Sequence, residues 1–248
     1  HGYYVTRNAP YLDCMARSSL PEADIVRTIK VLEKAGFGGG KIGIAFDEWN
    51  LRYWYHPGLG NFKRNAKINY WARRENDRAS TYTMADALFT ATFLNTCLRY
   101  CNIVKMANFS PIVNTRGAIF VHENGIVKRT TFHVFWMYTN LLEANVAPVE
   151  VKCGKISKGR VSSPLVDAVL TISNDGTRKV LAVVNKSPDK TVSFDISALT
   201  SAIKLNATIL DGDSPDAFND IGAENRVVPR TVELNVNGGN VSLAPHSL

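Results

Sequence analysis

The sequence predicts a two-part chain, with parallel strands and helices over residues 1–145 and an antiparallel β-sandwich over residues 146–248. Up to about residue 145, stretches with apolar residues at helical spacing alternate with short apolar runs, which is the rhythm of a parallel β/α unit in a barrel or in a doubly wound sheet. From about Val149 onward, short strands of alternating polarity are separated by turn sequences every ~8–12 residues, which is typical of a sandwich.

Three helices are predicted in the first part. The stretch "PEADIVRTIKVLEKAGF" carries apolar residues on one face, with Pro21 in its first turn and Gly36 where a helix should stop. The stretch "TMADALFTATFLNTCLRYC" begins with Thr83 and Asp86 at the spacing of a capping box. A third helix is expected at about 130–142.

Buried strands are predicted between these helices and in the second part. "IGIAF" (42–46) is apolar on both faces, as a central parallel strand would be, and "IVKMANFSPIVN" is a further buried strand. The strands of the second part are expected in "AVLTIS", "KVLAVVN", "TVSFDI", "LNATIL" and "TVELNV", which are separated by turn sequences such as "NDG", "SPD" and "NGG".

Composition excludes several classes of protein. The 248 residues are 45% hydrophobic and 21% charged, which is ordinary globular composition. The net charge of +7 comes from scattered Lys and Arg, so no nucleic-acid partner is expected. No apolar run reaches the ~20 residues of a membrane span. Four cysteines are too few for a disulfide framework, and no His near Cys97 and Cys101 completes a zinc set, so neither a metal nor a cofactor is expected.

One connection is much longer than its neighbours. More than thirty residues separate Phe46 from Met84, whereas loops after parallel strands usually need ~2–6. Asp47 and Glu48 open this connection, and seven aromatic residues follow between Trp49 and Trp71. Ligands bind at the carboxyl ends of parallel strands, and aromatic faces suit sugar rings, so a sugar site is one interpretation. A packed loop that caps the sheet is the other.

Several motifs resemble glycoside hydrolase family 51, the retaining α-L-arabinofuranosidases. "IAFDEWNLRYWYHPG" is similar to the segment that ends the seventh barrel strand of that family, and "HGYY" to its His-x-Tyr element after strand six. "MANFSPIVNTRG" resembles strand eight, "GIVKRTTFHVFWMY" the eighth helix, and "GDSPDAFND" with "APHSL" the C-terminal sandwich. The resemblance implies the C-terminal portion of a (β/α)8 TIM barrel followed by the sandwich.

The resemblance also implies roles for individual residues. Glu48 is the expected nucleophile, with Asp47 as a supporting neighbour. The sugar-binding residues are then His1, Tyr3, Asp47, Trp54 and Asn114. Two departures from the family pattern affect this set: "LRYW" is longer than the "VW" of many members, and Pro111 stands where many members have a sugar-contacting Gln, for which Asn114 is the substitute.

A second carboxyl group is needed for this chemistry. In the resembled family the acid/base Glu follows an Asn at the end of strand four, and no "NE" dipeptide occurs in these residues. We therefore expect the acid/base Glu on a preceding segment of the same enzyme or on a second chain. The expected partners are this N-terminal half, an arabinose-containing oligo- or polysaccharide, and further copies of the chain in a homo-oligomer.

Two alternatives to an arabinofuranosidase remain at this point. One is an endo-acting β-1,4-glucanase or xylanase, because some relatives of the family cut glucan or xylan backbones. The other is a non-catalytic carbohydrate-binding subunit, against which the intact Glu48 argues. The expected location is the cytoplasm, with secretion as the alternative.

Overall fold

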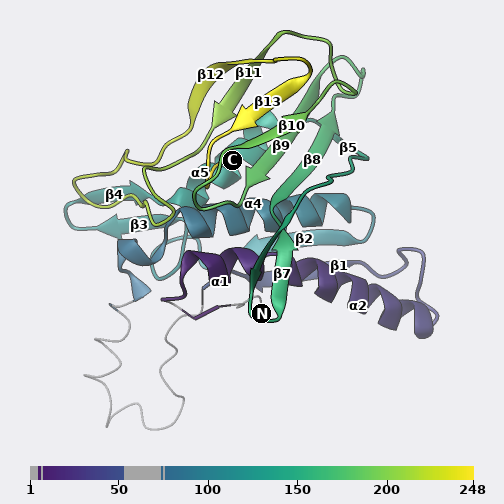
Figure 1. The fold of residues 1–248 in the computed structure, drawn as a ribbon. Helices are drawn as coiled ribbons and strands as arrows, with labels where there is room; N and C mark the ends of the chain where they lie inside the picture. Colours follow the sequence, from purple (N-terminus) through teal and green to yellow (C-terminus); the bar gives the residue numbers. More distant parts are fainter. Residues whose placement is uncertain (1–4, 7, 53–73, 75) are drawn as a thin grey trace.

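The structure is a computed structural model and describes the chain except for residues 1–4, 7, 53–73 and 75. Its described helices lie in the first part of the chain, and most strands of the second part lie above them in Figure 1. The elements of the first part are α1 (Tyr11–Ala16), α2 (Leu20–Lys34), β1 (Ile44–Trp49), the 3-10 turn η1 (Ala79–Thr81), α4 (Met84–Arg99), β2 (Val104–Phe109), β3 (Ile119–His122), β4 (Gly125–Lys128) and α5 (Thr130–Leu141).

A parallel pair of strands forms the base of the first part. β1 and β2 pair in parallel, and α4 lies in the connection between them, which makes one βαβ unit. A parallel bridge between Val5 and Arg52 continues this arrangement toward the start of the chain. The parallel direction predicted for this strand is confirmed. Whether it belongs to a closed (β/α)8 barrel stays a prediction, as does a domain boundary near residue 145.

Helix α4 lies at the centre of the molecule. Its residues are buried on nearly every side, because it contacts α1, α2 and α5 as well as strands β2, β8 and β9. The predicted capping box is present: the Thr83 hydroxyl accepts a bond from the Ala85 amide, and the Asp86 carboxylate accepts one from the Thr83 amide at 2.9 Å. Because it is buried on nearly every side, α4 is the core on which the other layers pack.

The second part consists of antiparallel strands. They are β5 (Asn145–Ala147), β6 (Lys155–Lys158), β7 (Val161–Pro164), β8 (Val166–Ile172), β9 (Lys179–Asn185), β10 (Val192–Asp195), β11 (Lys204–Ile209), β12 (Arg230–Asn235) and β13 (Asn240–Leu243). They pair in the order β5-β8-β9, β10-β13, β11-β12 and β6-β7, all antiparallel. Each of the five strand sequences predicted here contains a strand, and the fold is of the sandwich type.

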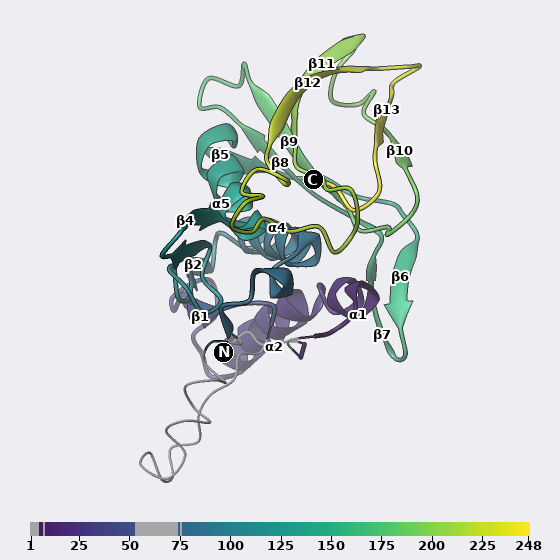
Figure 2. The ribbon, with the colours of Figure 1, turned by 90° about the vertical axis from the view of Figure 1, so that its left-hand side faces the viewer.

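The β6-β7 hairpin connects the two parts of the molecule. It extends away from the other strands and lies beside α1, as Figure 2 shows. Here the Lys186 side chain is fully buried and donates to the hydroxyls of Ser18 at 3.1 Å and Ser163 at 2.7 Å. Burial lowers the pKa of Lys186 to about 8. A buried amine thus joins the helical part to the strands.

Two predictions about the parallel strands were wrong. β1 spans Ile44–Trp49 instead of ending at Phe46, and it is not buried on both faces, since Ala45 and Asp47 are exposed. Met106 on β2 is likewise about half exposed. The face of this strand pair opposite α4 is therefore not covered by the residues that the structure describes. None of the helices in the described ranges is both long and apolar enough to cross a lipid bilayer.

Candidate active site

A β-bulge places the two acidic residues at the carboxyl end of β1. In the pairing register, Phe46 lies opposite Ala107 and Trp49 opposite Phe109, so β1 uses one residue more than β2 over this interval. Asp47 and Glu48 are the residues inside the bulge. Bulges re-aim side chains and are common next to active sites. The acidic pair therefore departs from the simple alternation of the strand.

Trp49 belongs to the core and not to a sugar site. Its ring is fully buried and stacks on Phe93 of α4 with centroids 3.9 Å apart, while Phe109 meets it edge-on at 5.1 Å. Phe46 also packs on Phe93, with centroids 5.1 Å apart. Of the seven aromatic residues from Trp49 to Trp71, Trp49 therefore packs in the core, as expected if this connection is a packed loop and not a sugar site. The other six lie outside the described residues.

The Glu48 carboxylate is held by two described donors that reach the same oxygen. The Ser110 hydroxyl donates to Oε1 at 3.1 Å, and Nη2 of Arg116 donates to it at 3.2 Å. The Arg116 side chain is 2% exposed, whereas that of Glu48 is 33% exposed. A buried guanidinium thus fixes a carboxylate that remains accessible from one side. This is the arrangement that an attacking carboxylate needs, because attack requires both a defined direction and access.

Asp47, the other acid of the pair, is exposed. None of the described residues hydrogen-bonds to its carboxylate. The structure thus separates the two acids by environment: Glu48 is anchored and partly covered, while Asp47 faces solvent. Of the two, Glu48 has the surroundings of a catalytic group.

Asn114 shapes the turn that carries Arg116. It adopts a φ of 53°, its Oδ1 accepts a bond from the Val121 amide at 2.7 Å, and its carbonyl accepts one from the Gly117 amide at 2.6 Å. Asn tolerates this left-handed conformation better than most residues. Its side-chain oxygen therefore has a structural partner. A sugar contact by Asn114 stays a prediction.

Three of the predicted sugar-binding residues, His1, Tyr3 and Trp54, lie outside the described residues. Their roles stay predictions. Across the described ranges, no group of three or more His, Cys, Asp or Glu side chains is arranged to hold a metal ion. The four cysteines are free thiols.

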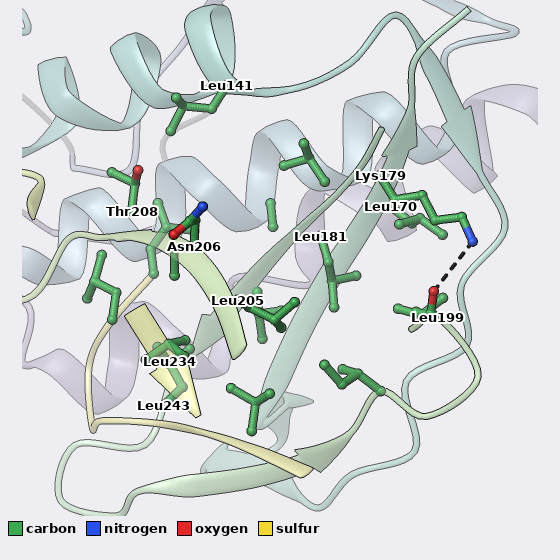
Figure 3. A pocket seen from close by; sticks show the side chains of 18 of the residues that line it. Leu141, Leu170, Lys179, Leu181, Leu199, Leu205, Asn206, Thr208, Leu234 and Leu243 are labelled. Carbon is green, nitrogen blue, oxygen red and sulfur yellow. Dashed lines mark hydrogen bonds between the residues drawn. The ribbon is translucent and has the colours of Figure 1, made fainter. Parts of the chain in front are cut away.

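A separate cavity of about 540 Å³ lies within the strand part (Figure 3). Among its described lining residues, none comes from β1, β2 or the turn that carries Arg116. The side chains facing it are largely aliphatic, contributed by α5 and the strands of the sandwich, and include Leu141, Leu170, Leu181, Leu205, Leu234 and Leu243. Sugar sites need aromatic faces and convergent polar groups. This cavity is the loosely filled apolar interior of the sandwich and does not fit a carbohydrate.

Comparison with known proteins identifies the family. The model of the α-L-arabinofuranosidase C-terminal domain matches residues 47–247, which is most of the chain. The chain belongs to this family. The match begins at Asp47, so it includes the acidic pair, the turn around Arg116 and the whole sandwich.

Curated relatives of this chain carry consistent names. An intracellular exo-α-(1→5)-L-arabinofuranosidase from Bifidobacterium longum is 24% identical over 264 residues, covering 96% of this chain and 46% of the relative. One of the same name from Halalkalibacterium halodurans is 25% identical and covers 88% of this chain and 44% of the relative. A probable α-L-arabinofuranosidase C from Aspergillus clavatus is 27% identical, covering 71% and 33%. The chain thus spans less than half the length of these relatives.

Solved structures show the same fold. A family 51 α-L-arabinofuranosidase from Bifidobacterium longum superposes with a TM-score of 0.77 at 23% identity, covering 100% of this chain and 51% of that one. The enzyme of family 51 from Thermotoga petrophila also gives a TM-score of 0.77, at 20% identity, covering 97% and 49%. The resemblance drawn from the sequence motifs is confirmed: the chain matches the C-terminal domain of α-L-arabinofuranosidases and shares its fold with enzymes of family 51.

Sequence reasoning missed Ser110 and Arg116, two described residues that hydrogen-bond to Glu48. The motif "MANFSPIVNTRG" contained both, but only Pro111 and Asn114 were considered in it. The available signal was an arginine directly before a glycine, in the loop after the strand that neighbours β1. Because loops at the carboxyl ends of adjacent parallel strands converge, such an arginine can reach the acid of the neighbouring strand.

Proposed function

We propose that the chain supplies the nucleophile of a retaining α-L-arabinofuranosidase, with Glu48 as that nucleophile. The observation that carries this proposal is the anchored, partly exposed Glu48 carboxylate at the carboxyl end of a parallel strand. Membership of the arabinofuranosidase family supports the reaction class. The (β/α)8 barrel to which residues 1–145 would contribute three β/α units is part of the proposal.

In the proposed mechanism, Glu48 attacks the anomeric carbon as the glycosidic bond to the leaving oxygen breaks. A second carboxylic acid protonates that oxygen, so a neutral alcohol leaves and a glycosyl ester remains on Glu48. The same carboxyl group then removes a proton from water, which cleaves the ester with retention. Retaining enzymes place the two carboxyl groups ~5–5.5 Å apart. We propose that the second one comes from a preceding segment or a second chain, facing Glu48.

The proposed substrates are terminal α-L-arabinofuranosyl residues on arabinoxylan, arabinan or arabino-oligosaccharides. The Bifidobacterium and Halalkalibacterium relatives are intracellular exo-α-(1→5)-L-arabinofuranosidases, which supports exo action on α-(1→5) linkages and a cytoplasmic location. His1, Tyr3, Asp47, Trp54 and Asn114 are the proposed sugar-contacting residues. Assembly into a homo-oligomer and with the N-terminal half belongs to the same proposal.

The two alternatives have weaker support. A bifunctional glucanase-xylanase superposes with a TM-score of 0.53 at 12% identity, well below the arabinofuranosidases. A purely carbohydrate-binding role does not explain why a buried arginine orients an accessible carboxylate. The apolar cavity of the sandwich offers no second sugar site for such a role.

Replacement of Glu48 in the catalytically competent protein tests the proposal. Glu48→Gln keeps the shape but cannot attack, so turnover of 4-nitrophenyl α-L-arabinofuranoside should fall by several powers of ten, equivalent to about 5–8 kcal/mol. Asp47→Asn is the matched control, because the neighbouring acid is exposed, and it should lose far less. Similar losses for both variants would contradict the assignment.

Covalent trapping gives an independent check. A cyclophellitol-type or 2-fluoro arabinofuranosyl inactivator should attach to Glu48, as located by mass spectrometry of the digested protein. With Glu48→Ala, added azide should restore turnover and yield the inverted arabinofuranosyl azide, because a small anion takes the place of the missing carboxylate. A label on Asp47 would overturn the assignment. The 248 residues alone should show no turnover, since the second carboxyl group is proposed to lie elsewhere.

A further inference from the structure

The Arg116 guanidinium donates hydrogen bonds to two partners, a main-chain carbonyl and a carboxylate. Its Nε donates to the Ser110 carbonyl at 3.0 Å, and its Nη2 donates to Oε1 of Glu48 at 3.2 Å. The Ser110 hydroxyl reaches the same Oε1. These three residues therefore contact one another: Ser110 and Arg116 both bond to Glu48, and Arg116 also bonds to the Ser110 carbonyl.

The main chain of Arg116 is tied to the strand that carries Glu48. Its carbonyl accepts a bond from Nδ2 of Asn50 at 3.0 Å, and Asn50 is buried two residues after Glu48. The side chain of Arg116 thus contacts one residue of the "DEWN" sequence and its backbone contacts another. Any movement of this turn away from β1 breaks both contacts together.

The turn around Arg116 is rigid for reasons visible in its backbone. Asn114 and Thr115 both adopt positive φ, and a Cβ on Gly117 would come within 2.5 Å of the Ile112 carbonyl group, so only glycine fits there. Arg129 donates to the carbonyls of Thr115 at 3.0 Å and Gly117 at 2.9 Å.

Arg129 is buried, and its guanidinium stacks on Tyr82 at 4.0 Å. The turn therefore presents Arg116 in one conformation, with little side-chain freedom left to lose.

We propose that Arg116 is a positioning residue that fixes the direction of the Glu48 carboxylate for attack, with Asn50 holding Arg116 in place. This inference rests on the proposed function of Glu48. Anchoring Oε1 through two donors restricts rotation of the carboxyl group and so sets where Oε2 points. Arginine suits this task because its planar fork bonds the Ser110 carbonyl and the carboxylate at once, which a single ammonium group cannot do in the same geometry.

Arg116→Met tests this role in the catalytically competent protein. A misdirected nucleophile should lower kcat and kcat/KM by the same factor, about 100-fold, while KM stays unchanged. Arg116→Lys restores the charge without the fork and should recover part of the loss. Arg226→Met is the matched control, since Arg226 is an ion-paired arginine on the surface of the sandwich, and it should leave both constants unchanged.

The rate at which a cyclophellitol-type inactivator labels Glu48 separates this inference from the proposed function. If the label maps elsewhere in the unmodified protein, the proposed function fails. If the label maps to Glu48 and Arg116→Met is labelled at the unmodified rate, the proposed function stands and the positioning role is overturned. The expected result is labelling of Glu48 that slows in proportion to kcat/KM.

Two milder variants cover the case in which Arg116 variants do not fold. Ser110→Ala removes the other donor to Oε1, and Asn50→Ala releases the Arg116 backbone without touching Glu48. Each should slow the labelling of Glu48 by about 10-fold, consistent with one lost hydrogen bond to a charged or buried group. Unmodified labelling rates in both variants would overturn the inference, whatever the folding of Arg116→Met.

Discussion

The two parts of the molecule differ in how deeply they bury some of their ion pairs. In the helical part, Arg52 pairs with Asp86 at 2.9 Å with both side chains almost completely covered, and the buried Arg116 pairs with Glu48, whereas the Arg27–Asp24 pair on α2 is exposed. The strand part leaves its ion pairs at the surface, as in Arg226–Asp213 at 2.7 Å and Lys204–Glu233 at 2.6 Å.

Burying a charge is costly unless a partner compensates it, whereas exposed pairs contribute little. The difference predicts that breaking a buried pair costs more stability than breaking an exposed one.

Buried charge also occurs on the strand side: Asp167 of β8 is buried and pairs with Arg99 of α4 at 3.1 Å, and Lys186 is a buried cation. It lies at the junction of the two parts and its described hydrogen-bond partners are the hydroxyls of Ser18 and Ser163. No full negative charge therefore contacts it directly among the described residues, and its pKa falls to about 8 as a result of burial. Burying Lys186 thus costs stability. Its hydrogen bonds in turn join the segment after α1 to β7 and to the end of β9.

The largest effect expected from this comparison is on the buried pair. Asp86→Ala leaves Arg52 buried without its carboxylate and removes the bond to the Thr83 amide, so the free energy of unfolding should fall by about 3–5 kcal/mol. Urea unfolding followed by circular dichroism measures it. The matched acid in the strand part is Asp213, and Asp213→Ala should leave the midpoint unchanged within error. Equal losses in the two variants would remove the distinction between the parts.

A smaller effect is expected at the junction, and it depends on pH. The unfolded chain keeps Lys186 protonated up to about pH 10.5, whereas the folded protein releases the proton from about pH 8. The unfolded state therefore binds more protons in this window, and the contribution of Lys186 to stability rises as pH increases. Its full size is about 3 kcal/mol.

Comparison with Lys186→Met isolates this contribution. The stability of the unmodified protein relative to this variant should rise between pH 8 and 10.5, while the raised pKa values of Tyr11 and Cys14 affect both proteins alike. Lys190→Met, which alters an exposed lysine nearby, should keep the slope of the unmodified protein. A flat difference between the unmodified protein and Lys186→Met would show that Lys186 stays protonated in the folded state over this range, as it does in the unfolded chain, and would contradict the lowered pKa.

The smallest effect on stability is expected at the start of α4. Thr83→Ala removes the hydroxyl that accepts from the Ala85 amide but keeps Asp86 and its pair with Arg52, so the loss in unfolding free energy should be about 1 kcal/mol. Thermal unfolding measures it. If this loss equals that of Asp86→Ala, capping and not charge burial explains the stability of this region.

Features set by local sequence were predictable. The cap formed by Thr83 and Asp86, the end of α2 before Gly36 and the strands between turn sequences all depend on residues a few positions apart, and they were found. Glu48 was singled out through its motif, and its role as the nucleophile stays a prediction. The structure of the long connection after it stays open, because most of that connection lies outside the described residues.

Features set by contacts distant in sequence were not predictable in the same way. The inward direction of Trp49 depends on a bulge that appears only when β1 pairs with β2. The contact of Arg116 with Glu48 joins residues 68 positions apart. The exposed face of β1 was missed because a run of apolar residues does not reveal which neighbours will cover it.

The extra residue in β1 has a consequence for how this protein can change over evolutionary time. In a regular strand Phe46 and Trp49, three positions apart, would point to opposite faces, yet both pack on Phe93. Because β1 has one extra residue between Phe46 and Trp49, both rings can point to the same face. The directions of Asp47 and Glu48 therefore do not follow from the packing of Phe46 and Trp49. Substitutions at these two positions need not disturb the aromatic cluster, whereas deleting one residue would invert it. Chemistry at this strand end can therefore vary while the scaffold stays constant.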